Sequence, residues 1–73
     1  MSTTIVLLGQ RVRPLESIAR VGSVLGLTRS TAFKIAEDRW PLDGDKGSRK
    51  VIVPALAKQL GIPYRCVVDE VDK

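Results

Sequence analysis

The sequence predicts a mainly α-helical fold with one small β-hairpin, and three features of the chain support this class. Apolar residues recur at helical spacing on both sides of a short turn within residues 21–35. A segment rich in turn-forming residues, 43–50, is followed by a β-branched run, which is typical of a hairpin. A proline at position 54 then begins another helical pattern. Together these features predict two helices, a hairpin and a third helix, in that order.

The first helix is expected over residues 14–25. Pro14 has the fixed φ angle that suits the first position of a helix, and Gly26 ends the pattern. Between them the apolar residues at helical spacing are Leu15, Ile18, Val21 and Leu25. In residues 1–13 a short β-branched run does not distinguish strand from helix, so both remain open.

The second helix is expected over residues 29–38. Thr28 should be its N-cap, because a threonine hydroxyl can accept a hydrogen bond from an amide of the first turn. Residues 21–35 have the spacing of a helix-turn-helix, and its buried positions would be Val21, Leu25, Leu27, Ala32 and Ile35. Gly22 takes the place where the two helices cross closely, since a larger side chain there would push them apart.

The hairpin is expected to use residues 40–43 and 51–53 as its strands, and Trp40 should pack it onto the helices as a core residue. A helix-turn-helix followed by a hairpin is a winged helix-turn-helix. The third helix should start at Pro54 and end at Gly61, a residue suited to the left-handed position after a helix. Pro63 should begin one more short helical stretch.

Composition and charge indicate one domain with an anionic partner. The 73 residues should form a single domain, 1–73, with a core over about 14–63 and apolar flanks, 1–13 and 64–73, that could serve in self-association. The net charge is +4, and residues 1–65 alone hold 11 bases and five acids, a net of +6. This basic excess favours a partner such as DNA.

Residue usage argues against several other classes of protein. The chain has no histidine and a single cysteine, Cys66, so imidazole chemistry and an internal disulfide are excluded, and Cys66 should be a packed apolar residue. The apolar runs are too short for a membrane span or a signal peptide, which leads us to expect a protein of the host bacterial cytoplasm. We see no catalytic constellation, and expect no enzyme, cofactor, metal or small-molecule ligand.

The exposed side of the second helix carries the candidate DNA contacts, because the major groove accepts one α-helix whose first turns contact base edges. The candidates are Thr28, Arg29, Ser30, Thr31, Phe33 and Lys34. Arg29 can form two hydrogen bonds with a guanine and should be the chief base contact, whereas Lys34 suits a phosphate. Phe33 could instead pack within the protein.

Three cations near the hairpin tip are candidates for contact with phosphates or the minor groove: Lys46, Arg49 and Lys50. Arg49 is the first choice among them. The alternative for both sets of residues is an ordinary solvated surface.

The runs LGLTRSTAFKIAEDRWPL and RKVIVPALAKQLGIP resemble the short MerR-like winged-helix proteins of the excisionase family, over about residues 15–63. The likeness is greatest to a phage excisionase, with a mycobacteriophage as the candidate source. It implies a recombination directionality factor that binds and bends attachment-site DNA and directs a partner integrase toward excision. By position, residues 28–31 and Lys34 match the family's recognition helix, and the three hairpin cations match its wing. Many relatives have a tyrosine in place of Phe33, so a hydroxyl contact to phosphate is absent here.

Two other functions fit the same residues. A small winged-helix transcriptional repressor would use the same contacts, and a winged-helix protein-interaction module would have an incidental basic face. Only 12 residues follow Gly61, which favours an architectural factor over an activator with an effector domain. We expect such a factor to assemble cooperatively on adjacent DNA sites rather than as a stable free dimer.

Overall fold

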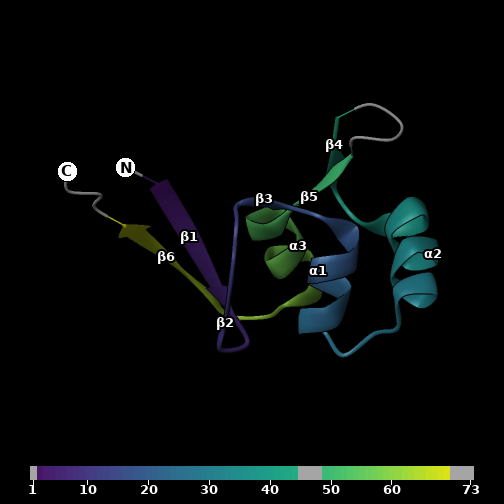
Figure 1. Ribbon diagram of the computed structural model, residues 1–73, viewed down its shortest axis with the longest axis horizontal. Helices are drawn as coiled ribbons and strands as arrows, with labels where there is room; N and C mark the ends of the chain where they lie inside the picture. Colours follow the sequence, from purple (N-terminus) through teal and green to yellow (C-terminus); the bar gives the residue numbers. More distant parts are fainter. Residues whose placement is uncertain (1, 45–48, 70–73) are drawn as a thin grey trace.

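The computed structural model describes residues 2–44 and 49–69, and these form three helices and six strands (Figure 1). In chain order the elements are β1 (Ser2–Leu7), β2 (Gln10–Val12), β3 (Leu15–Glu16), α1 (Ile18–Val24), α2 (Arg29–Arg39), β4 (Leu42–Asp43), β5 (Lys50–Ile52), α3 (Val53–Leu60) and β6 (Tyr64–Asp69).

The strands form two antiparallel three-stranded sheets, so the fold is mixed α/β. One sheet has the strand order β2-β1-β6 and the other the order β3-β5-β4. The expected class, mainly α with a small β-hairpin as in a winged helix-turn-helix, is therefore wrong. It missed one whole sheet and the third strand of the other.

The missed sheet is built from the two segments that flank the expected core. β1 and β2 form a hairpin, and β6 pairs along the whole of β1, from Ser2 opposite Asp69 to Leu7 opposite Tyr64. The short helix expected after Pro63 is therefore wrong. The valines and the tyrosine of this segment favour strands as readily as an apolar helix face, and their partner strand lies at the other end of the chain, where no local pattern reveals it.

The predicted start of the first helix is also wrong, because α1 begins at Ile18 and not at Pro14. Ser17 is the N-cap, and its hydroxyl accepts a hydrogen bond from the Arg20 amide at 3.2 Å. The residues before it are extended, with Leu15 opposite Ile52 and Glu16 opposite Val51 in the second sheet. A serine cap and strand pairing thus outweigh the preference of proline for a first helical turn.

The remaining elements are present where the sequence predicts them, with shifted bounds. α2 spans Arg29–Arg39, and β4 and β5 pair as a hairpin with Leu42 opposite Val51. The outgoing strand is shorter than the expected 40–43, because Trp40 caps α2, and Val53 begins α3 instead of ending the return strand. α3 ends at Gly61, whose φ of 70° is left-handed as expected. The hairpin tip, with Lys46, lies outside the described residues.

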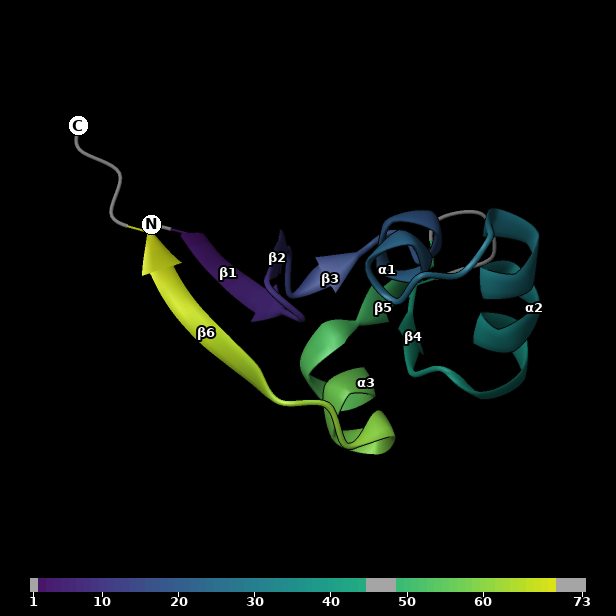
Figure 2. The same ribbon diagram turned by 90° about the horizontal axis from the view of Figure 1, so that it is seen from below.

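One hydrophobic core joins both sheets to the three helices. Its buried members are Ile5, Leu7, Val12, Ile18, Val21, Ala32, Ala36, Trp40, Val51, Val53, Leu56 and Ala57. Trp40 is only 6% exposed, which confirms its expected place in the core. The β1–β6 ribbon and α2 lie at opposite ends of the molecule, with α1 and α3 between them (Figures 1 and 2).

Candidate nucleic-acid interface

The helices α1 and α2 are packed together at one very close approach. A Cβ added to Gly22 would overlap the Cβ of Ala32, so only glycine fits at this position. The expected helix crossing at Gly22 is confirmed. Of the five expected buried positions, Val21 and Ala32 are fully buried, while Leu25, Leu27 and Ile35 are half-buried against the core.

The N-terminus of α2 is capped as the sequence predicted. The Thr28 hydroxyl oxygen accepts a hydrogen bond from the Thr31 amide at 3.3 Å, and the Thr28 hydroxyl donates to the Thr31 hydroxyl at 2.8 Å. Both residues are exposed, but their hydroxyls bond to each other. Their first role is therefore to fix the start of the helix.

Most of the surface of α2 faces solvent. The helix fully buries two small residues, Ala32 and Ala36, and the larger side chains around it are exposed or half-buried. Ser30 and Lys34 are exposed one turn apart, and helical geometry places them roughly opposite the two alanines. This outward side of α2 is open to a binding partner.

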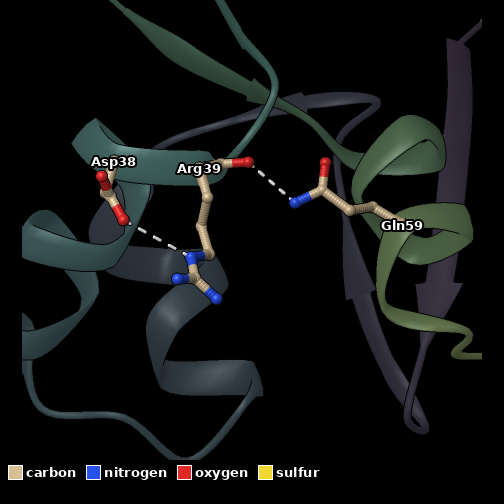
Figure 3. A network of polar contacts seen from close by, with 3 residues as sticks. All are labelled: Asp38, Arg39 and Gln59. Carbon is tan, nitrogen blue, oxygen red and sulfur yellow. Dashed lines mark hydrogen bonds and ion pairs between the residues drawn. The ribbon is translucent and has the colours of Figure 1, made fainter.

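The C-terminus of α2 is held by α3. The side-chain amide of Gln59 donates a hydrogen bond to the main-chain carbonyl of Arg39 at 2.7 Å, and Figure 3 shows it directed across the gap between the two helices. The Arg39 side chain pairs with Asp38, with 3.5 Å between Nε and Oδ2. The contacts with α1 and with α3 together fix the direction in which α2 projects.

An open groove of about 510 Å³ runs beside α2. One wall is the stripe formed by Arg29, Phe33 and Glu37, which are spaced four residues apart and so share one side of the helix. The other lining residues are Arg49, Lys50 and the start of α1, residues 17–19. The second helix and the hairpin therefore present three cations to a single concave surface.

Arg29 is supported within this groove by Phe33. Its guanidinium carbon lies 5.9 Å from the centroid of the Phe33 ring, within the range of a cation–π contact. Phe33 is 37% exposed, so it is a surface residue and not part of the core. Phe33 therefore has a contact within the protein, with Arg29.

Arg49 is paired across the groove with an acid of α2. Its Nη2 atom lies 3.7 Å from Oε2 of Glu37, and the Arg49 side chain is 32% exposed. The sequence prediction gave Glu37 no part in the site. Its spacing of four residues from Phe33 and eight from Arg29 was the available signal.

The described residues contain no group of three or more histidine, cysteine, aspartate or glutamate side chains that could hold a metal ion. None of the described helices is long and apolar enough to cross a membrane.

Comparisons of the chain with protein-family models, with curated proteins and with solved structures found no match.

Proposed function

We propose that this protein binds double-stranded DNA in a sequence-specific manner, with α2 in the major groove and the base of the β4–β5 hairpin against the neighbouring phosphates. The observation that carries the proposal is the shared groove in which Arg29 of α2 meets Arg49 and Lys50 of the hairpin. A helix with a cationic flank fits the major groove, and cations beside it fit the backbone that borders that groove.

Arg29 is the proposed base contact. Its planar guanidinium can donate two parallel hydrogen bonds to the O6 and N7 atoms of guanine. The contact with the Phe33 ring restricts the Arg29 side chain before binding, so less conformational freedom is lost in the complex.

The remaining exposed residues are proposed to contact the backbone. Lys34 and Ser30 lie on the outward side of α2, where an ammonium and a hydroxyl can bind phosphate oxygens without depending on base sequence. Lys50 and Arg49 would do the same from the hairpin. Such contacts set affinity and orientation, and Arg29 supplies the discrimination between sequences.

Selection from a pool of random-sequence duplexes tests this function, because the selection itself identifies the target sequence. The protein should enrich a short motif that contains a guanine, and Arg29→Ala should select a pool that lacks this guanine preference. Recovery of an unenriched pool by the wild-type protein would contradict sequence-specific binding.

The resemblance to excisionases supports a narrower proposal, that the bound DNA is an attachment site and that the protein directs an integrase toward excision. An in vitro recombination assay with the neighbouring integrase tests it. A directionality factor should stimulate excision and inhibit integration, whereas a transcriptional repressor should change neither reaction. Loss of this narrower role would leave the proposed DNA binding intact.

A further inference from the structure

β6 forms one margin of its sheet, at the end of the molecule away from α2 (Figures 1 and 2). It pairs on one side with β1, and within the described residues no strand pairs with its other side. We propose that two copies of this chain pair through these outer edges, with their β6 strands antiparallel and centred on Val67, to form one six-stranded sheet.

The outer edge of β6 has the chemistry of a pairing surface. An edge strand presents a row of main-chain N–H and C=O groups, which a second extended strand can satisfy. Proteins usually protect such edges with charged side chains, above all lysine, or with proline, bulges or very short strands. β6 is six residues long, its sequence YRCVVD contains neither proline nor lysine, and its two charged residues, Arg65 and Asp69, are of opposite sign.

The charged residues of β6 favour a second copy of this strand as the partner, and they favour the register centred on Val67. In an antiparallel pair centred on Val67, Arg65 of each copy stands opposite residue 69 of the other, an aspartate, so the pairing joins opposite charges twice. A pairing centred on Cys66 would instead put Arg65 opposite Val67, with no countercharge. Opposite charges in directly facing positions stabilise a strand pair, and like charges destabilise it. The strand is thus complementary to a second copy of itself.

Exposed apolar residues lie where the pairing would cover them. Val68 is 59% exposed, on the strand position opposite Thr3 of β1. Cys66, opposite Ile5, is exposed as well, so the expectation that it is a packed apolar residue is wrong. In the proposed register Cys66 of each copy lies opposite Val68 of the other. Each apolar side chain therefore gains an apolar neighbour, which reduces the surface left in water.

The pairing leaves the candidate DNA surface open, because α2 lies at the other end of each copy (Figure 1). A dimer of this kind would carry one α2 helix at each of its far ends. The inference does not depend on the proposed function, since it concerns the free protein, and it replaces the expectation that copies of the chain associate on DNA and not as a free dimer.

Charge reversal tests the register. Arg65→Asp gives a strand with acids at both positions, and Asp69→Arg gives one with bases at both. Each variant alone should dimerise with an affinity about tenfold or more below that of the wild type. An equimolar mixture of the two variants should form a heterodimer with an affinity close to that of the wild-type dimer. Sedimentation equilibrium would measure all three. The residues facing positions 65 and 69 in β1 are Val6 and Ser2, both uncharged, so each variant should keep the wild-type circular dichroism spectrum and unfolding curve.

Disulfide formation gives an independent measurement of the same register. Cys66→Ser combined with Val67→Cys places the new thiol opposite itself in the pair, within reach of a disulfide, so this variant should cross-link quickly under mild oxidation. The native Cys66 would be offset by two residues from its copy and should cross-link much more slowly. A wild-type protein that stays monomeric at millimolar concentration, charge variants that dimerise as well as wild type, or faster cross-linking through Cys66 would each overturn the proposal.

Discussion

Arg49 Nη2 lies 3.7 Å from Glu37 Oε2, so an ion pair joins the hairpin to α2 across the groove between them, the candidate surface for DNA. Glu37 is exposed and Arg49 is half-buried, and an ion pair with such access to solvent stabilises the fold by at most about 1 kcal/mol. We expect the ion pair to affect DNA binding more than it affects the stability of the fold. A phosphate that approaches Arg49 must compete with the carboxylate, and the carboxylate itself repels the phosphate.

Glu37→Gln should therefore raise DNA affinity by about three- to tenfold at low salt, since it releases Arg49 and removes the repulsion. Asp38→Asn is the matched control, because it makes the same change in net charge one residue away, where the carboxylate pairs with Arg39 and does not line the groove. Fluorescence anisotropy titrations of a labelled duplex would compare the two variants. Equal gains would show that only net charge matters and that the ion pair has no role in binding.

Gly22→Ala should destabilise the protein, because the added Cβ would overlap that of Ala32. We expect a net loss of about 1–2 kcal/mol in urea unfolding, after the gain of about 1 kcal/mol that alanine brings to a helix over glycine. Ser23→Ala, at the exposed next position of α1, is the control and should cause no loss.

The reciprocal change checks the cause of that loss. Gly22→Ala combined with Ala32→Gly removes the overlap, so the double variant should be more stable than the sum of the two single losses predicts. Simple additivity would show that the close approach of the helices is not what requires glycine at position 22.

Leu8→Asn should stabilise the protein by about 1 kcal/mol. Leu8 has a φ of 51° in the β1–β2 turn, a conformation that asparagine tolerates better than leucine, and the pair Asn-Gly is favoured in a type I′ turn. The residue is exposed, so little apolar burial is lost. Leu8→Ala is the control, because alanine keeps the strained conformation and should bring no gain in stability. If its melting temperature rose as much as that of the asparagine variant, relief of backbone strain would not be the cause of the gain.

Arg29 and Arg49 should differ in how they affect specificity. Arg29→Ala should weaken binding to a selected site by about 10- to 100-fold, and binding to a scrambled duplex much less, because it removes a base contact. Arg29→Lys keeps the charge but not the two parallel donors, so it should also lose discrimination. Arg49→Ala should weaken binding to both duplexes similarly. Gel-shift titrations at fixed salt would measure all three, and equal losses for Arg29→Ala on the two duplexes would contradict its role.

The parts of the fold that the sequence predicted are those governed by short-range patterns. The Thr28 cap, the Gly22 crossing, the β4–β5 hairpin and the end of α3 at Gly61 each follow from residues within a few positions of one another. The β1–β6 pairing joins the two ends of the chain, and no local pattern specifies it.

The same limit applies to the candidate site. Its residues on α2 could be assigned to one side of a helix from their spacing. The contact between Glu37 and Arg49 depends on how the hairpin packs against α2, and so it became visible only in the folded structure.

The dependence of DNA affinity on salt tests most directly whether this surface binds DNA. With three phosphates neutralised, by Lys34, Arg49 and Lys50, the logarithm of the association constant should fall with the logarithm of salt concentration with a slope of about −3. Arg49→Ala should reduce the steepness of that slope by about one unit. A wild-type slope near zero, or a slope that Arg49→Ala leaves unchanged, would contradict DNA binding through the groove between α2 and the hairpin.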